Sequence, residues 1–424
     1  FLTPCGTGKI ERSKGNYNYI QTDYSIPCGK LSFDLTRVYN SQSNKNGVLG
    51  TGWTSWYQMQ AYESDNNIIL EDGDGSCLIY VNDGNGKYSS ERDEKSYFTK
   101  VTDSDEYSYR QVYKDGTIYT YNNYGYLVKI QEVNGSYLEL IYDYHNRVVE
   151  RIISHSKSEE SGEQSVHEAR FIYSFTNYNN KMRLIGIMLP NGAILAYSHS
   201  GDKLMKVKIT GENGVGEISY NYEYQNGQLV KVYDAKKTGV YNIQYSNDRV
   251  SKCIYPDGTY VQMDYSDSSN ESSYSKKTLQ NNEISSGYEV YDDNGYVIRM
   301  LDRSGASEGT LHSYQYEGHK MTGSMETVSY QKLVNGVVTD YQKSIGDTFE
   351  YERNGNVTRI EYEDGSIITY VYDLNGEITK NLPTSITKEE GEDTLFKYNL
   401  EYNDNGNVTK IEDEINKGVI TIIY

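Results

Sequence analysis

The sequence predicts an all-β fold: a repeat array of antiparallel β-hairpins that forms a curved, continuous sheet, with an N-terminal β cap. Three observations predict it. The 424 residues include 46 Tyr but only 6 Ala, and Tyr favours strands whereas Ala favours helices. A unit of the form Tyr-x-x-x-Gly recurs along most of the chain. Asn-Gly and Asp-Gly pairs, which suit tight turns, separate segments in which apolar and polar residues alternate.

The cap is expected to span residues 1–105, because the Tyr-Gly unit is absent there and both tryptophans lie there. Residues 31–35 alternate as a strand does, and residues 58–80 look like two strands around a turn rich in Asp and Gly. Core packing is the expected role of Trp53 and Trp56. A platform that stacks on sugar rings is the alternative.

The repeat array is expected to span residues 106–424. Its clear copies supply the structural repeat residues, which are Tyr121, Gly125, Tyr222, Gly227, Tyr291, Gly295, Tyr351, Gly355, Tyr372, Gly376, Tyr402 and Gly406. Degenerate copies start at Tyr142 and Tyr245. A lone hairpin is marginally stable in water, whereas stacked hairpins bury a continuous ladder of Tyr and aliphatic side chains.

Three polar segments interrupt the array, at residues 156–168, 268–286 and 385–395. They are rich in Ser, Glu, Lys and Asn and carry few apolar residues. Such composition is typical of loops. The sequence therefore predicts polar loop insertions between hairpin units, and it shows no convincing amphipathic helix.

The charge balance excludes some classes of partner. Lys plus Arg is 41 and Asp plus Glu is 60, a net charge of −19. Proteins that bind nucleic acid neutralise phosphates with basic surface, so neither nucleic acid nor an anionic membrane surface is an expected partner. The longest apolar run, residues 184–189, is far shorter than the roughly 20 residues of a membrane-spanning helix. Because the chain starts at Phe1 without a signal-like segment, we expect a fragment or a processed piece.

Catalytic and cofactor motifs are not found. Residues 5–10 resemble a phosphate-binding loop but lack its first Gly and the Ser or Thr after Lys. The six histidines show no H-E-x-x-H frame, no G-x-S-x-G elbow occurs, and the 60 carboxylates select no glycosidase pair. We therefore expect no catalytic residue, no cofactor and no metal site. Calcium at Asp72 and Asp74 is weighed against a tight turn, which is favoured. A Cys5–Cys28 disulfide is weighed against buried thiols, which are favoured.

The Tyr-Asp-x-x-Gly units resemble the YD repeats of the RHS family. The cap resembles the domain that commonly precedes those repeats, whose pattern runs from D-x-S-I-P to R-x-Y-N-S and G-x-L-G-x-G-W. Its residues here are Asp23, Ser25, Ile26, Pro27, Arg37, Tyr39, Asn40, Ser41, Gly47, Leu49, Gly50, Gly52 and Trp53. Within this set Asn40, Ser41, Gly50, Gly52 and Trp53 form the structural head motif.

The resemblance implies a spiral β-sheet shell, as in bacterial RHS toxins, insecticidal toxin-complex cocoons and the barrel of animal teneurins. In the bacterial members the shell belongs to a large secreted or surface protein and encloses a variable C-terminal toxin domain. The family's self-cleavage segment of the Asp-Pro-x-Gly type does not occur here, because the chain has no Asp-Pro pair.

The expected function is therefore that of a non-catalytic shell or scaffold segment that encapsulates or displays a C-terminal effector. Its expected partner is the rest of its own polypeptide, including that passenger domain, and an acidic wall would favour a basic passenger. The alternative is an adhesin-like surface module that binds carbohydrate or a partner protein. The expected location is secreted or on the bacterial cell surface.

Overall fold

The computed structural model describes residues 6–28, 31–84, 86–90, 93–102, 104, 106–143, 148–157, 164–211, 216–236, 240–303, 309–317, 320–334, 337–352, 356–373, 382–403 and 406–423. Almost every element in these ranges is an antiparallel strand. The exception is one 3₁₀ turn, η1 (Trp56–Gln58). The predicted all-β fold is confirmed, with long antiparallel sheets in place of helices.

The N-terminal strands form a four-stranded sheet in the order β1-β2-β3-β6, with β4 and β5 paired separately. We call residues 6–59, which hold this sheet, the head. Its elements are β1 (Thr7–Glu11), β2 (Asn16–Cys28), β3 (Leu31–Asn40), β4 (Asn46–Gly47), β5 (Gly50–Thr51) and β6 (Trp53–Ser55). Leu35, Val38 and Tyr39 of β3 are buried, so the sheet packs on more than one side.

An eleven-stranded sheet follows, in which each strand pairs with its neighbours in the sequence. Its strands are β7 (Gln60–Ser64), β8 (Asn67–Glu71), β9 (Cys77–Asn82), β10 (Lys87–Ser90), β11 (Asp93–Lys100), β12 (Tyr107–Tyr113), β13 (Ile118–Asn122), β14 (Leu127–Gln131), β15 (Tyr137–Asp143), β16 (Val148–Lys157) and β17 (Gln164–Arg170). β11 pairs with β12, so the hydrogen-bonded sheet runs without interruption past residue 105. A cap of residues 1–105 remains a prediction from sequence.

The rest of the chain forms a 21-stranded sheet, again in sequence order. Its strands are β18 (Ile172–Tyr178), β19 (Lys181–Met188), β20 (Ile194–Ser200), β21 (Lys203–Thr210), β22 (Glu217–Gln225), β23 (Gln228–Asp234), β24 (Val240–Ser246), β25 (Arg249–Ile254), β26 (Tyr260–Ser266), β27 (Glu271–Lys277), β28 (Glu283–Tyr291), β29 (Val297–Arg303), β30 (Gly309–Glu317), β31 (Lys320–Val334), β32 (Val337–Tyr351), β33 (Val357–Tyr362), β34 (Ser366–Tyr372), β35 (Pro383–Glu390), β36 (Asp393–Tyr402), β37 (Val408–Asp413) and β38 (Gly418–Thr421).

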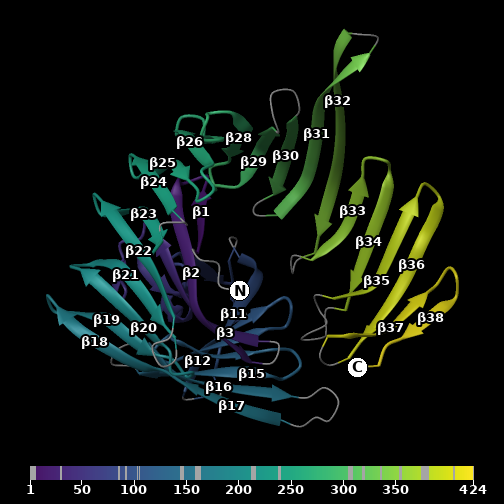
Figure 1. Cartoon of the computed structure of the whole chain (residues 1–424). Coiled ribbons are helices and arrows are strands. Elements are labelled where there is room, and N and C mark those ends of the chain that lie inside the picture. Colours follow the sequence, from purple (N-terminus) through teal and green to yellow (C-terminus); the bar gives the residue numbers. More distant parts are fainter. Residues whose placement is uncertain are drawn as a thin grey trace.

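The large sheet curves around the head (Figure 1). Its strands run from teal through green to yellow along an arc, and the purple head strands β1 and β2 lie inside the teal part of that arc. We call the face of this sheet that carries Tyr222, Ile243 and Met263 the inner face. Side chains of the head and of this face form one core cluster, which includes Tyr19, Trp53 and Tyr222.

The buried core ends part-way along the sheet. Met263 in β26 is the last apolar side chain that is buried among the described residues. Beyond it the buried side chains are polar, such as Ser272 and Thr327. The first half of the large sheet is therefore a packed two-layer structure with the head, and the second half is a single layer.

Two sequence predictions about elements were wrong. The segments 268–286 and 385–395 are not loops, because they contain β27, the start of β28, and parts of β35 and β36. Segment 156–168 holds the end of β16 and the start of β17. Few apolar side chains pack on these strands. Hydrogen bonds to the neighbouring strands, rather than apolar burial, therefore stabilise them.

Residues 58–80 also hold one more strand than predicted. The Asp-Gly turn at residues 72–76 is present, but Asp65 and Asn66 form an additional turn between β7 and β8, both with positive φ. Asn and Asp tolerate this left-handed conformation without Gly. The missing Gly is why this turn escaped prediction.

Candidate functional site

The candidate site is the interface where the head lies on the inner face. Residues about 185 positions apart meet there: Arg37 Nη1 donates to the Tyr222 hydroxyl at 2.9 Å. Arg37 also forms a bidentate ion pair with Asp23, with N–O distances of 2.6 and 2.8 Å. Both side chains are fully buried, and Tyr197 donates a further hydrogen bond to Asp23.

Burial makes this ion pair a strong determinant of how the head is seated. Burial by itself would lower the pKa of Arg37, but the Asp23 carboxylate and Tyr222 hold it well above its ordinary value. A buried charge is tolerated only when it is paired and hydrogen-bonded. Because Tyr197 and Tyr222 come from β20 and β22, removing the head would leave polar groups of the array without these partners.

Trp53 and Tyr39 also hold the head on the array, at β22 and at the start of β23. Trp53 Nε1 donates to the Tyr224 hydroxyl at 2.8 Å, and its ring lies edge-on to Tyr222 at 4.9 Å between centroids. The Tyr39 hydroxyl accepts a hydrogen bond from the Leu229 amide at 3.0 Å. Burial raises the pKa of Tyr39 to about 12. The expected core role of Trp53 fits this position, whereas the side chain of Trp56 lies outside the described residues.

A loop of the head, residues 46–51, binds the β19–β21 hairpins. Arg183 donates to the Gly47 carbonyl at 3.0 Å and to Asn46 Oδ1 at 2.8 Å, and it pairs with Asp202. The amide of Thr51 donates to the Asp202 carbonyl at 2.8 Å. Main-chain and side-chain contacts therefore both hold this loop on the array.

Glycine is required in this loop for two reasons. Gly50 has a φ of +101°, and a Cβ there would lie 2.6 Å from the Asp202 carbonyl oxygen. Gly52 has a φ of +80°, and its Cβ would lie 2.8 Å from the Tyr39 ring. Only glycine combines these dihedral angles with so close an approach.

The other two head-motif residues act within the head. Ser41 Oγ accepts a hydrogen bond from the Tyr17 amide at 2.8 Å and donates to Asn16 Oδ1 at 2.9 Å. Asn40 Oδ1 accepts from the Gln42 amide at 3.0 Å. These bonds set the turn that follows β3, and so the path of the loop that reaches the array.

The repeat tyrosines lie opposite β-bulges, in which the extra residue belongs to the following strand, and we call them the bulge tyrosines. The strand register shifts immediately before Tyr121, Tyr142, Tyr224, Tyr245, Tyr291, Tyr316, Tyr351, Tyr372 and Tyr402. A bulge adds one residue to a strand and increases its local twist. The repeat thus places a bend in successive hairpins. In the unit at residues 223–232 the bulge tyrosine is Tyr224, whereas the predicted Tyr222 lies two positions earlier and contacts Arg37.

The hydroxyl of a bulge tyrosine reaches back to the preceding bulge. Tyr245 donates to the Leu229 carbonyl at 3.0 Å, and Leu229 is the residue that pairs with Tyr224. Tyr372 donates to Val357, the partner of Tyr351, at 2.9 Å. Tyr402 donates to Pro383, the partner of Tyr372, at 2.7 Å. Phe could pack in these positions but could not make the bond, which accounts for the choice of Tyr.

The Asp or Asn that follows the tyrosine caps the turn. Oδ1 of Asn122, Asp292 and Asn403 accepts the amide four residues later at 2.9, 2.8 and 3.0 Å. The predicted turn residues Gly125, Gly227, Gly295 and Gly406 all have positive φ. Gly355 and Gly376 lie outside the described residues. Sequence reasoning missed the capping role, although the Asp or Asn after Tyr is visible in most copies.

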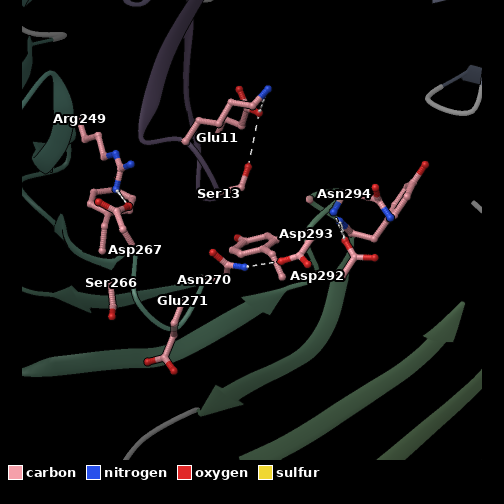
Figure 2. Close-up of a pocket in the computed structure, with 15 residues that line it drawn as sticks. Glu11, Ser13, Arg249, Ser266, Asp267, Asn270, Glu271, Asp292, Asp293 and Asn294 are labelled. Carbon is pink, nitrogen blue, oxygen red and sulfur yellow. Dashed lines mark hydrogen bonds and ion pairs between the residues drawn. The ribbon is translucent and has the colours of Figure 1, made fainter.

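A hollow of about 630 Å³ opens where the first hairpin of the head meets β25–β29. Figure 2 shows its acidic rim: Asp267 pairs with Arg249 at 2.7 Å, and Asn270 donates to Asp293 at 3.4 Å. Asp292 accepts turn amides. The labelled carboxylates Asp267, Asp292 and Asp293 therefore have structural partners.

The candidate calcium ligands Asp72 and Asp74 have roles within their own turn. In the described part of the chain no group of three His, Cys, Asp or Glu side chains could hold a metal ion. Asp72 and Asp74 each accept an amide of their own turn, at 2.6 and 2.8 Å. Cys77 and Cys253 are free thiols. Cys5 and the side chain of Cys28 lie outside the described residues, so their pairing stays a prediction. No helix in the described ranges is long and apolar enough to cross a membrane.

Comparisons with known proteins address the head and the overall topology. The family model of a domain of unknown function (DUF6531) matches residues 8–80, which include all five residues of the head motif. No curated protein matches the chain.

Among solved structures, the chain is similar to the crystal structure of TcdB2-TccC3-TEV, at 13% identity and a TM-score of 0.34. It is also similar to those of TcdB2-TccC3-Cdc42 and of TcdB2-TccC3 without its hypervariable C-terminal region, each at 12% identity and a TM-score of 0.33. Each alignment covers 94% of this chain and 23% of the other, so this chain spans less than a quarter of those proteins.

Proposed function

We propose that the chain is a non-catalytic wall segment of a bacterial secreted or surface protein of the RHS type. The wall encloses or displays an effector domain that belongs to the same polypeptide. The observation that carries this proposal is the inner face. One continuous sheet face is covered by the head as far as β28 and then extends to β38, with no other described part of the chain packed on it.

The construction of the sheet suits a wall. Each strand is hydrogen-bonded to its sequence neighbours, and the bulges that recur along the sheet increase its twist. The hydroxyls of Tyr245, Tyr372 and Tyr402 bind main-chain carbonyls. These tyrosines are thus used to hold the sheet, which favours enclosure over the alternative of carbohydrate recognition by the repeat tyrosines.

The test is limited proteolysis of the whole polypeptide in which the wall occurs, with fragments identified by mass spectrometry. We expect the effector domain to be cleaved more slowly when it is attached to the wall than when it is released. An R37A variant, in which the head is loosened, should remove part of this protection. Equal cleavage rates for attached and released effector would contradict the proposal.

A further inference from the structure

The two faces of β32–β38 differ in chemistry. On the outer face Arg359 lies 3.2 Å from Glu350 and 2.8 Å from Glu361, and Lys410 lies 2.9 Å from Glu401. Cross-strand pairing and alternation place a set of aromatic and aliphatic residues on the inner face. These are Phe349, Ile360, Tyr362, Ile368, Tyr370, Ile386, Phe396, Tyr398, Leu400, Ile411 and Ile420.

This apolar stripe continues the face that the head covers. The pairing Met263–Tyr274–Gly287–Asp302–Thr310 carries the inner face from β26 to β30. The pairing His312–Glu326–Ile345 carries it on to β32, where Asp347 follows on the same side. None of the stripe residues is buried, although residues of the same face in β19–β26 are. The stripe thus continues the face on which the head packs, and the head reaches along that face only as far as β28.

The head shows which chemistry this face accepts. Arg12 of the head lies 2.6 Å from Glu289, and its guanidinium stands 4.2 Å from the centre of the Tyr274 ring. The inner face thus offers Arg12 an aromatic ring, which attracts a cation, and a carboxylate that pairs with it. Arg37 also lies beside a ring of this face, Tyr222, but its carboxylate partner Asp23 belongs to the head.

The uncovered part presents the same combination at Asp347 and Tyr362. These two residues are direct cross-strand partners. Oδ1 of Asp347 is buried and has no hydrogen-bond partner, and burial together with Asp364 and Glu363 raises the pKa of Asp347. Lys388 Nζ lies 5.7 Å from the Tyr362 ring centre, so this ring already attracts one cation. A guanidinium is the group that would satisfy both the carboxylate and the ring.

We propose that the inner face of β32–β38 binds a polypeptide segment that bears arginine and aromatic or aliphatic side chains, with a guanidinium seated at Asp347 and Tyr362. The segment would present to β32–β38 the chemistry that the head presents to β20–β28. This inference rests on the proposed function and specifies the chemistry of the polypeptide that the wall encloses.

The probe is a fluorescein-labelled synthetic peptide in which Arg and Trp alternate with Ser, titrated into the full chain by fluorescence anisotropy. We expect saturable binding that D347N weakens by about tenfold, the loss typical of a hydrogen bond to a charged group. The matched control is E350Q, because Glu350 lies in the same strand on the outer face. It should bind as the unmodified chain does, and both variants should retain its melting temperature.

Two further peptides distinguish the terms of the proposal. Replacing Arg by Glu should abolish binding, and replacing Trp by Ser should weaken it. Equal binding of the Arg and Glu peptides, or equal loss with D347N and E350Q, would overturn the inference. The proposed function is tested separately by proteolysis of the D347N polypeptide. If the effector stays protected there while the labelled peptide does not bind the chain, enclosure stands and only this inference is overturned.

Discussion

At the scale of single residues, the repeat tyrosines act through their hydroxyls as well as their rings. Tyr245, Tyr372 and Tyr402 each donate to the carbonyl of the residue that pairs with the preceding bulge tyrosine. Neighbouring hairpins are therefore linked by side chains as well as by main-chain hydrogen bonds. Burial raises the pKa of Tyr372 to about 12, consistent with a hydroxyl that stays protonated as a donor. The ring of each of these tyrosines thus packs as other aromatic rings do, and its hydroxyl links one hairpin to the preceding one.

Replacing Tyr372 or Tyr402 by Phe should remove one hydrogen bond and leave a main-chain carbonyl unpaired. We expect each change to lower the free energy of unfolding by about 1 kcal/mol, measured by urea denaturation. Y178F is the control, because Tyr178 lies exposed at the end of β18. A change of the same size in all three variants would contradict a special role for the bulge hydroxyl.

Gly50 and Gly295 separate two effects of glycine. Both have positive φ, but only at Gly50 would an added Cβ meet a main-chain oxygen, whereas nothing lies within 4 Å of a Cβ at Gly295. We expect G295A to cost about 1–2 kcal/mol, the price of a left-handed alanine. G50A should cost more and should loosen the head, seen as faster exchange of the Thr51 amide. Equal costs would show that the loop can move away from Asp202.

The Asp23–Arg37 pair is the strongest single anchor of the head. D23N would leave the Arg37 guanidinium buried without its counter-charge, so we expect a loss of about 3–5 kcal/mol in the free energy of unfolding. The control is E63Q, which breaks the exposed pair between Glu63 and Lys100 and should cost no more than about 1 kcal/mol. Calorimetry of both variants decides whether burial makes the difference.

At the scale of elements, the β20–β21 hairpin holds a histidine against the head loop. Burial lowers the pKa of His199 from its ordinary value of 6.5, the main chain of Leu49 opposes this shift, and the Arg183 cation lowers the pKa further. The folded protein therefore binds a proton at His199 less readily than the unfolded chain does. Stability is retained above about pH 6.5 and is lost as the pH falls below it.

This sign gives a direct measurement. Between pH 7.5 and pH 5.5 the melting temperature of the unmodified chain should fall further than that of H199Q, which cannot take up the proton. Parallel curves for the unmodified chain and H199Q would contradict the assignment.

Sequence patterns predicted elements well where turns carry Gly and strands carry Tyr. They failed where these markers are missing, as in β27 and β35, whose residues are mostly polar. They also failed at Asp65-Asn66, a turn without glycine. In the unit at residues 223–232 the pattern alone could not choose between Tyr222 and Tyr224, because the shift in register at the bulge is set by the paired strand.

At the scale of the whole molecule, the sheet divides into a covered and an uncovered part. Apolar burial stabilises β19–β26, whereas β32–β38 depend mainly on their hydrogen bonds and ion pairs. Local opening follows such differences in contact density. We expect amide hydrogen exchange to be slower in β21–β25 than in β34–β37. W53A should accelerate exchange in β22 and β23 and leave β34–β37 unchanged, and uniform exchange along the sheet would contradict this division.

The seat of the head could not be predicted from sequence. The head-motif residues were identified through a resemblance, but their partners Tyr222, Leu229 and Asp202 lie more than 150 residues away and carry no distinguishing pattern. Only the winding of the sheet brings them together. The inner face likewise follows from pairing across many strands, which no local periodicity records.

The contact between Arg37 and Tyr222 has a consequence for biosynthesis. The head leaves the ribosome before the array does, so its Arg37–Asp23 ion pair is made before the partners Tyr197 and Tyr222 that cover it. Each hairpin that follows can then be laid down against it in turn, from β19 onward. The head would thus serve as a template on which the nascent sheet folds. Slow translation near residues 180–260 should therefore affect the folding yield more than slow translation after residue 300.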